Sequence, residues 1–174
     1  MVDELLNFYR HIMRRTITHA AGSLDPSTQN AAVLCQDRPG GLPFVLPHTF
    51  SVNEFPRGVE VTPERWERPA KYQYVEHAER NSIYLAASFG TKTFGLTLVC
   101  PWAACTDCAR AIIQAGIRCL VTIRPLRGDT NNRWDDSIRV AMGMLSEANV
   151  EVVYLDGPFN APYVVRRNGQ NINL

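Results

Sequence analysis

The sequence lacks any apolar run of the roughly 20 residues that a membrane-spanning helix needs, so we expect no membrane partner. It also lacks a surplus of either charge. Lys and Arg number 18 against 17 Asp and Glu, for a formal net charge of +1. Domains that bind nucleic acids usually have a basic surplus or a basic stripe, so we expect no nucleic-acid partner. A local basic pocket for one phosphate is compatible with this balance.

Cysteine is scarce, and its five positions are an odd number. The N-terminal MVDELLNFYRHIMRR has no apolar segment of the kind that secretion signals contain. We therefore expect no disulfide framework, and a reducing cytoplasm is the simplest compartment. Cys35, Cys100 and Cys119 lie in apolar, strand-like runs and are expected to be inert core residues.

The hydrophobic pattern alternates between helix-like and strand-like segments and contains no internal repeat. Helices are expected over 3–21, 76–89, 105–115 and 135–148. Strands are expected over 30–35, 44–52 (interrupted by Pro47), 94–100, 117–123 and 150–155. Residues 53–70 contain three prolines and are expected to form a long loop, of the kind that is often functional. This order favours a single α/β sandwich domain over residues 1–174, with a polar, disordered tail at 166–174.

Two short motifs supply metal ligands and a proton carrier. His77-Ala78-Glu79 is followed by Cys105-Thr106-Asp107-Cys108. One His and two Cys thiolates bind zinc and leave its fourth tetrahedral position to water, whose pKa the metal lowers toward neutrality. Glu79 can then take a proton from that water and pass it to a substrate. The pattern H-x-E … C-x-x-C is the signature of zinc nucleobase deaminases.

The alternative to a catalytic metal site is a closed structural one, or cysteines that only pack in the core. A structural zinc site usually has four protein ligands. The fourth would have to be Cys35, Cys100 or Cys119, and none of them has a characteristic pair spacing. The sequence therefore favours an open, catalytic site.

Four segments resemble the deoxycytidylate (dCMP) deaminases of the cytidine deaminase superfamily. They are Asp25–Leu34 (DPSTQNAAVL), Asn53–Gly58 (NEFPRG), Lys71–Ile83 (KYQYVEHAERNSI) and Cys105–Ile117 (CTDCARAIIQAGI). Two departures stand out. Family members usually have Pro directly before the first metal Cys, whereas here Trp102-Ala103-Ala104 separates Pro101 from Cys105, and Glu54 replaces the usual Gly of the second segment.

The resemblance implies a three-layer α/β/α sandwich with a mixed sheet of about five strands. It implies one catalytic zinc held by His77, Cys105 and Cys108, with Glu79 as the proton shuttle. The implied reaction is hydrolysis of dCMP to dUMP and ammonia through hydroxide attack on cytosine C4. Family members commonly form hexamers, with dCTP as activator and dTTP as inhibitor. Cytidine, deoxycytidine, 5-substituted dCMP and a tRNA adenosine remain alternative substrates, and a zinc-stabilised nucleotide-binding module is an alternative function.

The resemblance also implies substrate contacts. Asn53 is expected to bond the deoxyribose hydroxyl or the base, and the amide of Ala78 to face the base. Arg57 is the candidate for the 5′-phosphate, because a guanidinium binds phosphate bidentately. Trp134 either stacks over the base or caps the core. Trp66 is a lid, a subunit contact or a loop anchor, and Asp129 and Arg133 are candidates for the pocket mouth.

Overall fold

The computed structural model describes residues 2–124 and 134–174. Its middle layer is a mixed sheet in the order β2-β1-β4-β5-β6, with β3 also pairing with β1. Strand β1 runs antiparallel to β2, β3 and β4, whereas β4, β5 and β6 are parallel. The strands are β1 (Ala31–Arg38), β2 (Gly41–Val45), β3 (Ser51–Val52), β4 (Thr97–Val99), β5 (Cys119–Ile123) and β6 (Glu151–Leu155).

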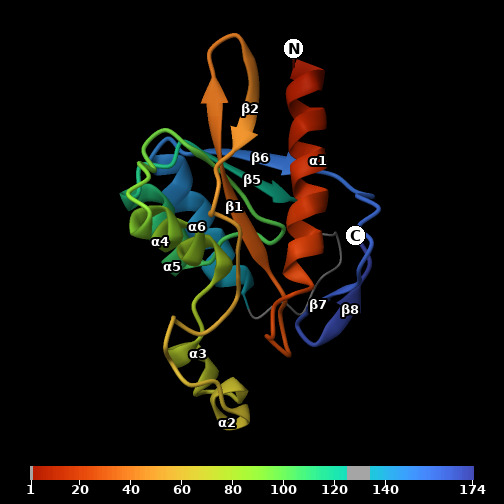
Figure 1. Cartoon of the computed structure of the whole chain (residues 1–174), viewed down its shortest axis with the longest axis vertical. Coiled ribbons are helices and arrows are strands. Elements are labelled where there is room, and N and C mark those ends of the chain that lie inside the picture. The colour runs from red at the N-terminus through yellow and green to blue at the C-terminus, as the bar shows by residue number, and fades with distance from the viewer. Residues whose placement is uncertain (1, 125–133) are drawn as a thin grey trace.

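Helices cover both faces of this sheet (Figure 1). One face packs against α1 (Val2–Ala20), and the other against α4 (Ala78–Ser88), α5 (Thr106–Gln114) and α6 (Asp135–Glu147). Side chains alternate between the faces along each strand. In β1, Ala32 and Leu34 join the core beneath α4–α6, whereas Val33 and Cys35 join the core beneath α1. The predicted three-layer sandwich is confirmed.

The predicted interruption of the strand over 44–52 at Pro47 is confirmed. The strand breaks into β2 and β3 because His48 adopts a left-handed φ of 60° and turns the chain. The Thr49 hydroxyl then accepts a hydrogen bond from the Leu34 amide at 3.2 Å and donates one to the Leu46 carbonyl at 2.8 Å. At the break, the Thr49 side chain thus takes the place of a backbone carbonyl as the hydrogen-bond partner of the Leu34 amide. The other predicted elements are found, with ends shifted by a few residues.

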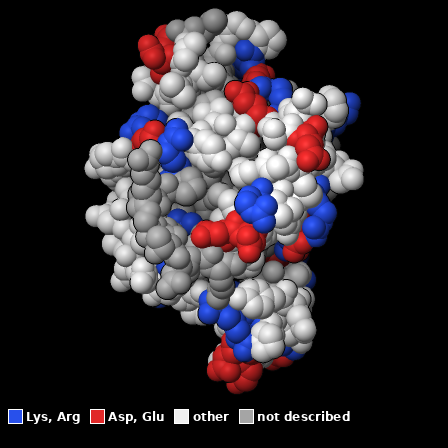
Figure 2. Space-filling view, turned by 180° about the vertical axis from the view of Figure 1, so that it is seen from behind, with Lys and Arg blue, Asp and Glu red and all other residues white. Residues whose placement is uncertain are grey.

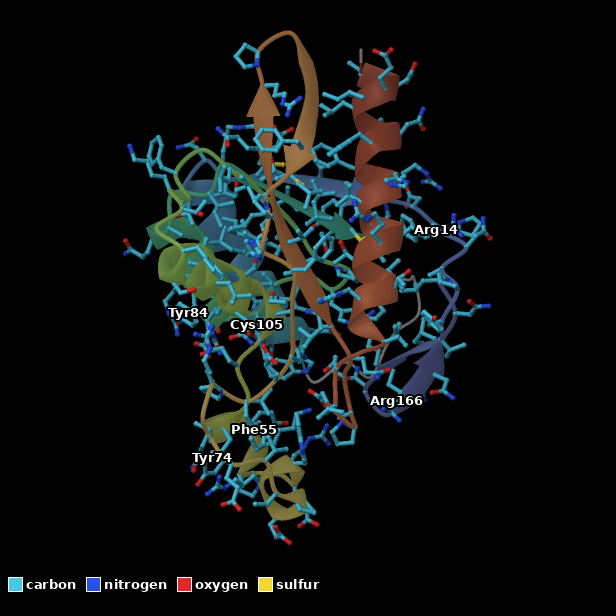
Figure 3. The ribbon with its side chains drawn as sticks, in the orientation of Figure 1. Arg14, Phe55, Tyr74, Tyr84, Cys105 and Arg166 are labelled. Carbon is cyan, nitrogen blue, oxygen red and sulfur yellow. The ribbon has the colours of Figure 1, made fainter. Side chains whose placement is uncertain are left out.

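The prediction of a disordered tail is wrong. Residues Val165–Arg167 (β7) and Gln170–Ile172 (β8) form an antiparallel hairpin beside the lower end of α1, where Figure 3 labels Arg166. Gln29 holds it: its backbone N–H donates to the Arg166 carbonyl at 2.8 Å, and its side-chain oxygen accepts from the Arg166 N–H at 3.0 Å. Besides these hydrogen bonds, Val165 is buried in the core beneath α1, and Ile172 and Leu174 pack against that core, so a few apolar residues within a polar segment order the hairpin.

The long loop after β3 contains the short helix α2 (Pro63–Trp66) and leads into α3 (Lys71–Tyr74). The Phe55 ring lies 4.5 Å from that of Trp66 and 5.9 Å from that of Tyr74, between centroids. Trp66 therefore anchors the loop, which is one of its three predicted roles. None of the described helices is both long and apolar enough to cross a membrane.

Candidate active site

The first turns of α4 and α5 bring three metal-ligand atoms together at the helical layer, near Cys105 in Figure 3. His77 Nδ1 lies 3.5 Å from the Sγ atoms of both Cys105 and Cys108, and the two Sγ atoms are 3.6 Å apart. A tetrahedral zinc separates such N–S and S–S pairs by about 3.5–3.8 Å, from its usual bond lengths. The donor triangle therefore fits zinc with one position left over.

No fourth protein ligand joins these atoms within the described ranges, where the three residues form the one such group of His, Cys, Asp or Glu. Cys100 is buried nearby, but it is outside the group. Burial raises the pKa of Cys100, and raises those of Cys35 and Cys119 to about 12, as expected for inert core thiols. The site is open rather than closed.

His77 and Cys105 are the N-cap residues of α4 and α5, so the positive ends of two helix dipoles point at the donors. A hydrogen bond from the Cys108 thiol, assisted by His77, lowers the pKa of Cys105 to about 4. The same bond, with burial, raises the pKa of Cys108. The two sulfurs thus share one proton, which a metal ion would displace on binding.

Glu79 lies in the first turn of α4 and is only 2% exposed. Its Oε2 accepts a hydrogen bond from Asn30 Nδ2 at 3.2 Å. Burial raises the pKa of Glu79 above the usual range of a carboxyl group. A carboxyl group shifted in this direction is suited to gain and lose a proton near neutral pH.

These residues open into a pocket of about 460 Å³, within the usual range for small-molecule sites. Its wall includes Asp25, Asn30, Lys71, Trp102, Trp134 and Arg167. On the face of the molecule that Figure 2 shows, basic and acidic side chains are interspersed rather than sorted by sign.

Asn53, predicted to contact the substrate, lines the pocket, but both ends of its side-chain amide already have protein partners. Its Oδ1 accepts from the Ala78 N–H at 2.9 Å, and its Nδ2 donates to the Thr28 carbonyl at 2.8 Å. The Ala78 amide, predicted to face the base, is thus engaged by Asn53. A direct substrate contact by either group would have to share or replace this bond.

Arg57 is exposed and is not among the residues of the pocket wall. Trp134 does line the pocket, with its ring edge-on to His77 at 6.0 Å and to Tyr72 at 6.1 Å between centroids. It also packs against the core beneath α4–α6, so both of its predicted roles stay open. Asp129 and Arg133 lie outside the described residues.

The pocket wall holds charged residues that the motifs did not indicate. Lys71 Nζ lies 2.5 Å from Asp25 Oδ1, and their side chains are 8% and 1% exposed. Arg167, from β7, places its guanidinium 4.8 Å from the centroid of the Trp102 ring. The Trp102 indole N–H donates to the Gln29 carbonyl at 2.9 Å. The longer turn before Cys105 is a sequence feature that could have indicated Trp102 as a pocket residue. No sequence feature indicated Arg167.

Residues 57–124 match the family model of the cytidine and deoxycytidylate deaminase zinc-binding region. An uncharacterised deaminase in the luxG 3′ region of Aliivibrio fischeri is 34% identical over 133 residues, which cover 76% of this chain and 83% of that protein. The deoxycytidylate deaminase of phage T4 is 37% identical over 100 residues, covering 56% of this chain and 44% of its own length. The human deoxycytidylate deaminase is 30% identical over 124 residues, covering 67% and 64% respectively.

The crystal structure of apo dCMP deaminase from cyanophage S-TIM5 has the same fold. Its TM-score is 0.63 at 20% identity, with 89% of this chain and 100% of that chain covered. This chain spans less than two thirds of the length of the phage T4 and human enzymes. The family match and the fitting donor set identify zinc as the cofactor.

Proposed function

Since the chain belongs to the cytidine and deoxycytidylate deaminase family, we propose that it converts dCMP to dUMP and ammonia by hydrolysis. One observation carries this proposal: His77 and Cys105, two members of the donor triangle that Cys108 completes, line the same pocket as the buried carboxyl group of Glu79. A module that only binds nucleotides would not need a carboxyl group in that position.

In the proposed reaction, water adds to C4 of the cytosine ring and the exocyclic amine leaves as ammonia. Zinc held by His77, Cys105 and Cys108 would supply the Lewis acidity that lowers the pKa of water. Glu79 takes the proton of the attacking water and gives it to the ring nitrogen, and a further proton goes to the leaving amine. One C–O bond forms and one C–N bond breaks, so no oxidant or reductant is required.

We further propose that Arg167, rather than Arg57, contacts the 5′-phosphate. Arg167 lines the pocket, whereas Arg57 is exposed and lies outside the pocket wall. The flat ring of Trp102 supports the guanidinium from one side, which orients its N–H groups before a phosphate arrives. The deoxycytidylate deaminases among the relatives support a nucleoside monophosphate as the ligand.

The test is ammonia release by zinc-loaded protein with dCMP, CMP, deoxycytidine, 5-methyl-dCMP and dCTP in parallel. A clear preference for dCMP is expected. Turnover of deoxycytidine at the same efficiency would remove the phosphate from the proposal. Turnover of none of the five, with zinc bound, would point to another deaminase substrate or to a binding module.

The family resemblance also leads us to propose a homo-oligomer, a hexamer by analogy, with dCTP as activator and dTTP as inhibitor. Sedimentation of the purified chain tests the assembly. The dCMP assay repeated with each triphosphate tests the regulation, and unchanged kinetics with both would refute it.

A further inference from the structure

The carboxyl group of Glu79 is held by a side chain from another layer of the fold. Asn30, the residue before β1, directs its Nδ2 at Glu79 Oε2 across 3.2 Å. Both side chains are buried, with Asn30 4% and Glu79 2% exposed. The contact joins positions 49 residues apart, so folding rather than local sequence creates it.

The Asn30 amide has a second neighbour in the Cys100 thiol, which lies close to both ends of the amide. Its Nδ2 also lies 3.3 Å from Cys100 Sγ, and the Cys100 thiol lies 3.5 Å from Asn30 Oδ1. That thiol contacts the Trp102 carbonyl at 3.4 Å as well. An ionised carboxylate accepts hydrogen bonds and cannot donate them, so it requires the NH₂ end of the amide to face it.

The backbone of Asn30 is tied to the same helix start. Its carbonyl accepts from the Asn53 N–H at 3.2 Å, and Asn53 Oδ1 in turn accepts from the Ala78 N–H at 2.9 Å. The chain of contacts from Asn30 through Asn53 and Ala78 returns to Glu79, and every member is buried. These hydrogen bonds connect the first turn of α4 to the start of β1.

A general acid and base must lie within hydrogen-bond reach of the proton that it moves, in one defined rotamer. Glu79 has a flexible side chain, and the hydrogen bond from Asn30 favours the rotamers that keep Oε2 within its reach. A hydrogen bond to Oε2 restricts rotation of the Glu79 side chain and leaves the other carboxyl oxygen available for proton transfer.

We infer that Asn30 is a positioning residue, which holds the Glu79 carboxyl group in the orientation that proton transfer in the pocket requires. The inference rests on the proposed deaminase function. It assigns Asn30 an effect on turnover through Glu79, and no part in metal binding.

The experiment compares Asn30→Val with Ser82→Ala in zinc-loaded protein. Val suits the start of a strand and removes the amide. Ser82 is a matched control because it is buried in the same helix and bonds the Thr49 carbonyl at 2.7 Å, away from the pocket wall. Asn30→Val should lower kcat for dCMP about 10- to 100-fold, the size expected for losing a hydrogen bond to a charged group. KM and zinc content should stay within about twofold of the wild type. Ser82→Ala should lose stability but keep kcat.

Unchanged kcat in Asn30→Val would overturn the inference. A lower kcat accompanied by a higher KM and a lower zinc content, in proportion to the loss of stability in both variants, would also overturn it. If Asn30→Val does not fold, Asn30→Ala takes its place in the same comparison.

A second measurement needs no activity. Asn30→Val should shift the urea midpoint less in a Glu79→Ala background than alone, because contacting residues are not additive. Equal shifts in both backgrounds would refute the contact. An inactive wild type that shows this coupling would refute the proposed function while supporting the contact.

Discussion

The position of Arg167 predicts a substitution that separates nucleotides from nucleosides. Arg167→Ala removes a guanidinium from the pocket wall and leaves the metal ligands and Glu79 untouched. A charge-assisted hydrogen bond contributes about 1.5–3 kcal/mol, which corresponds to about a 10- to 150-fold loss in kcat/KM for dCMP. Deoxycytidine has no phosphate, so its kcat/KM should change by no more than about twofold.

The same substitution removes a cation–π contact with Trp102, which contributes about 0.5–1 kcal/mol at a partly exposed site. Unfolding by urea should therefore show only a small loss of stability. Arg167→Lys keeps the charge but loses the fork of N–H groups, so it should retain part of the affinity for dCMP. Arg57→Ala is the matched control, since it removes an exposed Arg outside the pocket wall.

The assay measures kcat/KM for both substrates, and calorimetry with dUMP and deoxyuridine provides a second readout where deoxycytidine turnover is too slow. Equal losses on both ligands would show that Arg167 acts on the pocket in general rather than on the phosphate. If only Arg57→Ala lowered kcat/KM for dCMP, the phosphate contact would lie in the long loop, and the assignment to Arg167 would be contradicted.

Three other predictions follow from buried charges and thiols. Glu79→Ala should lower kcat at least 100-fold and keep zinc, by metal analysis, because the carboxyl group moves protons without binding metal. Lys71→Met should destabilise the fold by about 3 kcal/mol in urea unfolding, since it leaves the Asp25 carboxylate buried without its cation; Asp25→Asn in the same chain should restore most of the loss. Stability should fall as pH rises from about 9 to about 12, because Cys35 and Cys119 have their pKa raised to about 12 and stay protonated only in the folded state; a flat urea midpoint up to pH 10.5 would contradict this.

The metal ligands and Glu79 could be predicted from the sequence because each motif is local. His77 and Cys105 cap their helices, so the following turn places Glu79 and Cys108 without help from distant residues. The central strands were predictable for a similar reason, since strands buried on both faces appear in the sequence as short apolar runs. The meeting of the two helix starts at one point could not be predicted from local sequence, because it depends on the tertiary fold. The family resemblance was the basis for expecting it.

The polar contacts of the pocket could not be predicted in this way. Arg167 reaches the pocket because its hairpin is bonded to Gln29, and that hydrogen bond spans 137 residues of sequence. Arg57 was favoured by its loop and by a Pro-Gly context, yet the loop is anchored by Phe55 and Trp66, and the Arg side chain remains exposed. Composition reports which residues can bind a phosphate, and only packing determines which of them reaches it.

The two halves of the proposed reaction have different origins in this chain. The metal donors and Glu79 lie within residues 57–124, the part that matches the family zinc-binding region. Asn30 and Arg167, to which we assign the positioning of Glu79 and the phosphate contact, lie outside it. Trp102, from the longer turn, connects the two through Gln29 and the Arg167 guanidinium. The family match therefore indicates the chemistry, whereas under our proposal substrate preference depends on the pocket wall formed by the longer turn and the C-terminal hairpin.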